Sequence, residues 1–416
     1  MHPRGMVLGA LFVLALVGCT PAATPTTTST KPTAATPTTA GTTAPPSSPT
    51  PTEAAATEPG QAATPAARSN ESQPAGPVGT ADWREEWDKT VAAAKKEGKV
   101  VVVGSLGDNH RTAAMTFQRA YPEIRVDFTG AVTRQHALKL LAERRAGQYR
   151  SDVLLGAAME VYDGLVPGGA FDPLRPALLL PEVLEDSKWH GGFQDGWGDK
   201  DRRYVYLPLG FLAFSALVNR DFVPESELNS LDQLLDPKWA GKIVTLDPRR
   251  GGPAAASLQA LLIGKGEDFV RKLLAQDLVV KGENALAAAI VRGRYPISIG
   301  FQSQPLRFAQ GLSKSIKPLA QDELGGSVLG GGGGSVMLAN RAPHPNAARL
   351  YVNWVLSQEG QEAWVQATGY NSRRLDVEGP PDTAPDVRIR YVRPDREEAV
   401  PYYWRAMAIA EGILQR

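Results

Sequence analysis

Apolar and polar positions predict helices and buried strands in alternation from residue 83 onward. Apolar residues recur at helical spacing over 83–94, and the valine run at 99–103 is typical of a buried strand. A helix over 112–120, a strand over 125–128, a helix over about 133–146 and a strand over 152–155 follow. Such alternation predicts a parallel sheet, whose ligands lie beyond the carboxyl ends of its strands.

Three loops therefore share one rim of this sheet, starting at Ser105, Thr129 and Gly156. Small and polar residues gather in them, and they leave room for a ligand. We take as candidate binding residues Ser105, Gly107, His110, Gly130, Arg134 and Gly156. The alternatives are a solvated loop residue for His110 and an exposed ion pair for Arg134.

A second unit repeats this logic in the middle of the chain. The strand predicted at 242–246 leads through 247–253 into an alanine-rich helix that starts near Ala254. Glycines before a helix start expose backbone N–H groups, which bind anions, and guanidinium groups bind carboxylate or phosphate in a two-pronged way. The candidates here are Arg249, Arg250, Gly251 and Gly252; the arginines are otherwise exposed ion-pair partners.

The strand predicted at 297–301 ends in further candidates. Phe301 and, later in the chain, Tyr370 offer rings that stack on an apolar or sugar face, and Gln302 and Gln304 offer hydrogen bonds that orient a ligand. Phe301 has core packing as its alternative. The set predicts a small, anionic organic solute and requires no cofactor.

The first 81 residues differ from the rest. A short positive region, an apolar run over 6–17 and Gly18-Cys19 predict an export signal over 1–19, too short to span a bilayer permanently. Leu16-Val17-Gly18-Cys19 resembles the bacterial lipobox, in which the cysteine receives a lipid and becomes the first mature residue; the alternative is an ordinary secretory signal. Residues 20–80, rich in Thr, Pro, Ala and Ser, predict a disordered tether.

Composition narrows the classes of function. With 45 Lys+Arg against 44 Asp+Glu, the formal charge of +1 gives no field for nucleic acid. Cys19 is the single cysteine, which excludes a disulfide framework and a catalytic thiol in the folded part. The sequence lacks a Gly-x-Ser-x-Gly elbow, a Walker A loop and a His-Glu-x-x-His motif, so we expect no enzyme.

Three stretches resemble the extracellular solute-binding proteins of ABC importers, in the iron(III)-type branch. They are 87–104; 231–243 together with Asp247-Pro248; and 344–361 closing with Gly369-Tyr370. The resemblance implies an α/β fold of the periplasmic-binding-protein type: a two-lobed clamp, each lobe a mainly parallel sheet flanked by helices, joined by a hinge. Lobe 1 takes 82–210 and 331–416, and lobe 2 takes 211–330. The segments 206–211 and 330–334 are the expected crossings.

The resemblance also implies how the protein works. It captures a small solute, delivers it to ABC permease subunits, and sits as a monomer on the outer face of the bacterial cytoplasmic membrane, held by lipid on Cys19. Iron(III) proteins of this branch use an adjacent tyrosine pair, which is missing from 291–304; Tyr402-Tyr403 lies elsewhere and favours packing. The alternatives are an iron(III)-binding protein and a sensor that presents its ligand to a membrane kinase.

Overall fold

The structure is a computed structural model, and it describes most of the chain after residue 81. The described residues are 82–131, 133–156, 159, 161–213, 215–300, 315–320, 323, 328–330, 334–379 and 392–414. The predicted export signal, Cys19 and the predicted tether lie outside them. Within the described residues, no helix has the length and apolar character needed to cross a membrane.

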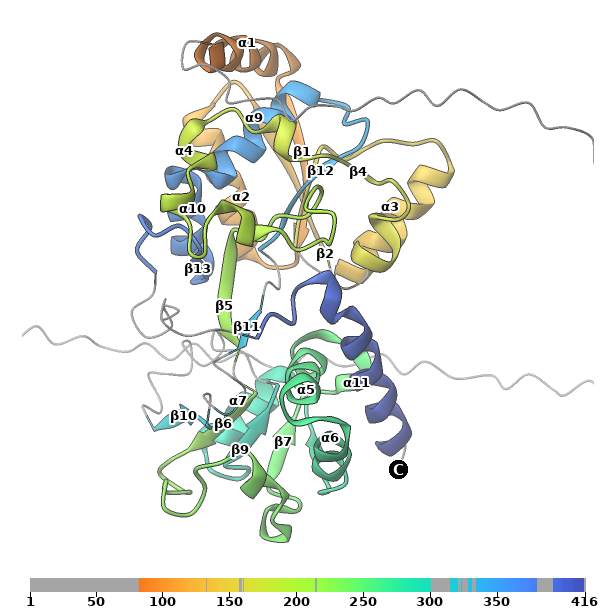
Figure 1. Ribbon diagram of the computed structural model, residues 1–416, viewed down its shortest axis with the longest axis vertical. Helices are drawn as coiled ribbons and strands as arrows, with labels where there is room; N and C mark the ends of the chain where they lie inside the picture. The colour runs from red at the N-terminus through yellow and green to blue at the C-terminus, as the bar shows by residue number, and fades with distance from the viewer. Residues whose placement is uncertain are drawn as a thin grey trace, which may run out of the picture. The chain divides into compact units, whose positions relative to one another are not determined.

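Two five-stranded sheets organise the described part of the chain (Figure 1). The first has the order β2-β1-β3-β12-β4 and the second β10-β6-β9-β7-β8. The strands of the first are β1 (Lys99–Ser105), β2 (Arg125–Ala131), β3 (Val153–Leu155), β4 (Phe171–Asp172) and β12 (Val336–Ala339). Those of the second are β6 (Ala216–Asn219), β7 (Ile243–Thr245), β8 (Val279–Val280), β9 (Ile297–Ile299) and β10 (Ile316–Pro318).

The helices fall largely where the apolar spacing placed them. Those before or between the strands of the first sheet are α1 (Asp82–Glu97), α2 (Asp108–Ala120), α3 (Thr133–Arg145) and the short α4 (Pro181–Leu184). Those of the second are α5 (Gly252–Lys265), α6 (Glu267–Leu274) and α7 (Glu283–Val291). The chain closes with α9 (Pro345–Leu356), α10 (Gln358–Thr368) and α11 (Val400–Ile413).

A small third sheet, β11-β5-β13, accompanies the passages between the two large sheets. Its strands are β5 (Leu209–Ala213), β11 (Val328–Gly330) and β13 (Asn371–Ser372). Tyr206, just before β5, bridges to Val336 of β12, while β6 of the second sheet begins at Ala216. The chain thus passes from one sheet to the other through β5 and returns through the stretch between β11 and β12. We call the body around each large sheet the first and the second lobe.

Each large sheet contains two parallel and two antiparallel pairings among its described strands, so the expectation of mainly parallel sheets needs refinement. In the first sheet both antiparallel pairings involve β12, and in the second both involve β6. These are the strands that enter each sheet after a passage from the other lobe.

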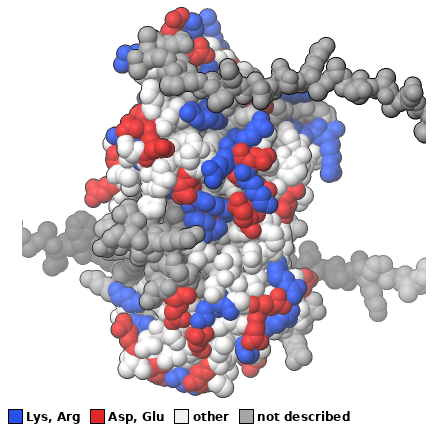
Figure 2. Space-filling view, viewed as in Figure 1, with Lys and Arg blue, Asp and Glu red and all other residues white. Residues whose placement is uncertain are grey.

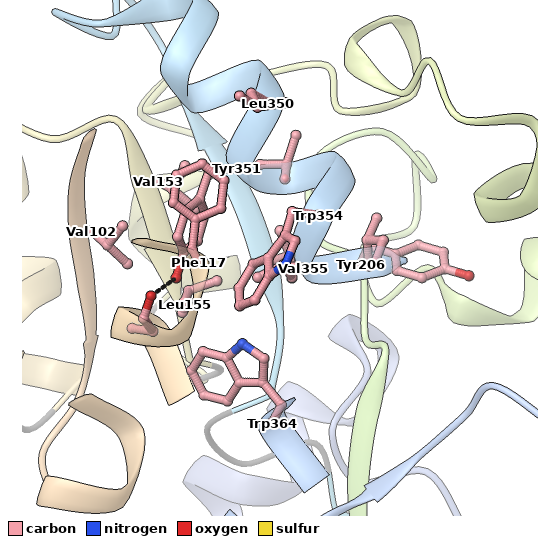
Figure 3. Close-up of a cluster of buried hydrophobic side chains, with 14 of the residues drawn as sticks. Val102, Phe117, Val153, Leu155, Tyr206, Leu350, Tyr351, Trp354, Val355 and Trp364 are labelled. Atoms are coloured by element: carbon pink, nitrogen blue, oxygen red, sulfur yellow. Dashed lines mark hydrogen bonds between the residues drawn. The ribbon is translucent and has the colours of Figure 1, made fainter. Parts of the chain in front are cut away.

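The core of the first lobe is aromatic (Figure 3). Phe117 of α2 is fully buried, and its ring lies 4.9 Å from that of Tyr351 and 5.4 Å from that of Trp354, both on α9. The hydroxyl of Tyr351 donates to the carbonyl of Ala114 on α2 at 3.4 Å. These contacts fix α2, which starts at the rim of the sheet, against the C-terminal helices.

The end of the chain departs from the expected domain limits. We expected 331–416 in the first lobe, but Ala406, Ile409 and Ala410 of α11 belong to the core of the second lobe together with residues of α5 and α6. Figure 1 shows α11 running beside α5. The apolar face of α11 covers α5 and α6, while Val400 and Tyr403 at its start share a cluster with residues of the first lobe.

Candidate functional site

The strand ends of the first lobe bring three of the predicted loops together. In the register of β1 and β2, Gly104 lies opposite Gly130. A Cβ atom on Gly130 would lie 3.1 Å from the carbonyl oxygen of Ser105, so the loops after β1 and β2 touch here. The N–H of Gly156, after β3, donates to the carbonyl of Ser335 at 3.0 Å. Ser105, Gly130 and Gly156 therefore share one rim, as the alternation of strands and helices predicted.

His110 lies beneath this rim rather than in solvent, so its alternative as a solvated loop residue is wrong. It is 6% exposed in the first turn of α2. Its Nδ1 lies 3.1 Å from Oδ1 of Asn109, and its Nε2 lies 3.3 Å from the hydroxyl of Tyr370. Burial lowers the pKa of His110, although a backbone hydrogen bond with Leu106 acts the other way. The ring is thus held in its neutral form.

Tyr370 packs inside the first lobe. It is 5% exposed, and its ring centroid lies 5.7 Å from that of His110 in an edge-on arrangement. We expected this ring to stack on a ligand. The structure instead places it against α2, because the end of α10 delivers it there directly before β13. Burial raises the pKa of its hydroxyl to about 12, so it remains protonated.

Arg249 is occupied within the second lobe. It lies in the turn Pro248–Arg250 that follows β7. Its Nε and Nη2 donate to the two carboxylate oxygens of Asp247 at 2.8 and 3.0 Å, and its Nη1 donates to the carbonyl of Leu414 at 3.1 Å. Its alternative as an ion-pair partner is therefore what the structure shows. Arg250 is exposed, and its guanidinium makes no hydrogen bond or ion pair in the described part of the chain.

The face of the molecule seen in Figure 2 carries no broad field of one sign. Figure 2 shows Lys and Arg side chains interspersed with Asp and Glu over the visible face of the molecule. This agrees with the near balance of 45 basic against 44 acidic residues in the sequence. That face therefore shows no basic patch of the kind that holds nucleic acid.

The two glycines at the start of α5 are not open donors, and this expectation is corrected. The N–H of Gly251 donates to the carbonyl of Pro248 at 3.2 Å, and that of Gly252 donates to the hydroxyl of Tyr403 at 3.0 Å. Tyr403, which sequence reasoning assigned to packing alone, takes the place expected of a ligand. The N-cap residue Gly251 supplies no side chain, and the first turn of α5 holds no acidic residue, so no carboxylate of this turn offsets the positive end of its dipole.

The strand β9 ends against α5. Gly300 has φ of +72°, and a Cβ atom there would lie 2.4 Å from the Cα of Ala254. The chain therefore leaves the second sheet beside the first turn of α5. That turn directly follows the turn Pro248–Arg250, which carries Arg250. Phe301, Gln302 and Gln304 follow outside the described part of the chain, as does the side chain of Arg134, whose backbone belongs to α3.

Two supporting residues escaped the sequence analysis. Asn109 accepts the N–H of His110 through its Oδ1 at 3.0 Å and so orients the loop after β1. His136 of α3 is buried, and its Nε2 lies 3.1 Å from the carbonyl of Gly104. The available signal was that each is a polar residue close in sequence to a predicted rim loop or in the predicted helix beside it. Among the described residues, no three His, Cys, Asp or Glu side chains come close enough together to hold a metal ion.

The sequence of residues 99–371 matches the family described as bacterial extracellular solute-binding proteins. An uncharacterized protein of Haemophilus influenzae is 26% identical over 215 residues, which are 48% of this chain and 60% of that protein. The chain thus matches less than two thirds of the length of that relative.

Solved structures share the fold. The Trichodesmium protein IdiA (FutA) in complex with iron and citrate superposes with a TM-score of 0.59 at 13% identity, over 77% of this chain and all of that one. Iron-bound HitA of Pseudomonas aeruginosa has a TM-score of 0.58 at 16% identity, over 76% and 99%. AfuA of Actinobacillus pleuropneumoniae with fructose 6-phosphate has a TM-score of 0.55 at 20% identity, over 77% and 99%. At these identities the likeness concerns the fold, a two-lobed α/β binding protein.

Proposed function

The chain belongs to the bacterial extracellular solute-binding proteins, and from this premise we propose that it captures a small anionic organic solute between its lobes and delivers it to an ABC permease. The carrying observation is the exposed guanidinium of Arg250, which makes no hydrogen bond or close ion pair among the described residues and stands directly before the start of α5. A cation beside a helix N-terminus favours carboxylate or phosphate.

The first lobe supports this proposal with neutral groups. Ser105, Gly130 and Gly156 form a rim of small residues that lets a ligand approach the backbone, and His110 stays neutral beneath it. Neutral donors opposite one cation suit a ligand with one strongly anionic end. Phe301, Gln302 and Gln304 follow directly from Gly300 and remain part of the proposed site.

The lipid anchor on Cys19 and the tether over 20–80 belong to the same proposal. They hold the binding protein near its permease while leaving it free to turn. About sixty residues give a mean reach near 40 Å when flexible, which exceeds the thickness of lipid head groups.

A direct test is mass spectrometry of the small molecules released when freshly purified protein is denatured, with metal analysis in parallel. We expect a stoichiometric organic acid or phosphate ester. Stoichiometric iron without an organic anion would support the iron(III)-binding alternative and overturn the anionic-solute proposal.

Single substitutions test which of the two arginines binds the solute. With fructose 6-phosphate and citrate as calorimetric probes, or with the released compound, Arg250→Ala is expected to weaken binding at least about tenfold, because a charge-assisted hydrogen bond contributes about 1.5–3 kcal/mol. Arg249→Ala is the matched control. Since its guanidinium is already paired with Asp247, it should change affinity less. Equal effects of the two substitutions would contradict the assignment.

A further inference from the structure

We infer that residues 392–414 form a strap that ties the two lobes together outside the strand passages and thereby sets the balance between lobe arrangements, on which affinity depends. This role goes beyond solute binding itself. Tyr403 and Leu414 do contact Gly252 and Arg249 at the candidate site, but the contacts that join the two lobes are made by other residues of the segment. The role rests on contacts that the segment makes with both lobes at once.

One set of contacts joins the strap to the first lobe. The hydroxyl of Tyr162 donates to the carbonyl of Asp395 at 2.8 Å, and Arg396 donates to the carboxylate of Asp195 at 2.5 Å and to its carbonyl at 2.8 Å. The indole N–H of Trp404 donates to the carboxylate of Asp163. Tyr162 is almost fully buried, so this attachment is part of the interior.

A second set of contacts, interleaved with the first along the strap, joins it to the second lobe. The side-chain amide of Gln259, buried on α5, donates to the carbonyls of Pro394 and Ala399 at 3.0 and 2.8 Å. Arg405 pairs with Glu267 of α6 at 2.7 Å. The apolar face of α11 completes the second-lobe core. Because Asp395 and Pro394 are adjacent, the strap contacts Tyr162 of one lobe and Gln259 of the other through neighbouring residues.

A charge cluster strengthens the attachment to the first lobe. Asp195 lies within 3.1 Å of Arg373, 3.5 Å of Arg393 and 2.5 Å of Arg396. Burial alone would raise the pKa of Asp195, but the hydrogen bond from Arg396 and the three positive charges lower it. Arg373 stands next to β13, whose partner β5 leads from one lobe to the other. The strap is therefore joined to the strand passage itself.

These contacts affect affinity because they change the fraction of molecules in each arrangement of the lobes. A two-lobed binding protein binds its ligand only through the fraction of molecules in the competent arrangement, so any contact that differs between arrangements changes the apparent dissociation constant. A segment attached to both lobes resists their relative movement. Weakening one attachment should reduce that resistance, and weakening the other as well should then add less than its separate effect.

The test measures lobe separation without ligand, so its failure is distinguishable from failure of the proposed function. Spin labels are placed on the full chain at Ala120→Cys and Ser226→Cys, both at exposed positions in different lobes, in a Cys19→Ser background. One variant, Arg396→Gln with Trp404→Phe, removes two side-chain contacts with the first lobe and so weakens that attachment. A second, Gln259→Ala, removes the hydrogen bonds from α5 and so weakens the attachment to the second lobe. A third combines all three substitutions.

We expect each of the first two variants to change the ratio of lobe separations about fivefold or more, which is the smallest typical coupling between sites. The combined variant should resemble the first two. Lys272→Gln is the matched control, since it removes an exposed ion pair with Asp268 on α6 that lies outside the strap. Melting temperatures are recorded for all. The inference would be overturned if the first two variants fold but keep the lobe separations of the unchanged protein, or if their effects add fully in the combined variant.

Discussion

Adding a single methyl group at Gly300 tests how closely the end of β9 approaches the start of α5. The φ of +72° at Gly300 is unfavourable for a side chain, and a Cβ atom there would lie 2.4 Å from the Cα and 3.0 Å from the nitrogen of Ala254. Backbone of a helix cannot move aside as a flexible side chain can. Gly300→Ala must therefore push the end of β9 away from the start of α5.

The cost has two parts. A left-handed conformation costs a residue with a Cβ about 1–2 kcal/mol, and overpacking in a tight contact costs about 1–3 kcal/mol more. We expect Gly300→Ala to lower the free energy of unfolding by about 2–5 kcal/mol. Urea unfolding followed by circular dichroism measures it.

Gly241→Ala is the control for the backbone part alone. Gly241 has φ of +70°, but no atom lies within 4 Å of the position that a Cβ would take there. This substitution should cost only about 1–2 kcal/mol. If the two variants lose the same free energy of unfolding, the close contact between Gly300 and α5 does not exist as described, and the proposal that Phe301 shares a site with Arg250 fails with it.

Two further predictions concern the first lobe. Burial lowers the pKa of His110, His136 and His190, so the unfolded chain binds more protons below about pH 6.5 and the free energy of unfolding should fall as pH drops from about 7.5 to about 5.5. Urea unfolding at both values measures this, and His110→Gln should reduce the dependence; an unchanged dependence would contradict the neutral, buried ring. Phe117→Ala should cost about 3–5 kcal/mol at the higher pH in the same assay, because it empties the centre of the aromatic core; a loss below about 1 kcal/mol would contradict that packing.

The sequence by itself determined the elements and the family. Valine runs and helical spacing located β1, α2, β2, α3 and β3, since local periodicity reports which face of an element is buried. The alternation then predicted that Ser105, Gly130 and Gly156 would meet at one rim. The same pattern indicated two lobes, which the family match and the shared fold confirm.

Only the tertiary structure decided which side chains remain available. Arg249 and Arg250 are neighbours with the same chemistry, yet Asp247 and Leu414 engage one and leave the other exposed. Tyr370 contacts His110, and Tyr403 accepts the N–H of Gly252. Partners such as Leu414 and Tyr403 lie 165 and 151 residues away along the chain, so no local pattern announces them. These hydrogen bonds join groups that are far apart in the sequence and adjacent only after folding. The local periodicity of apolar residues therefore does not predict them.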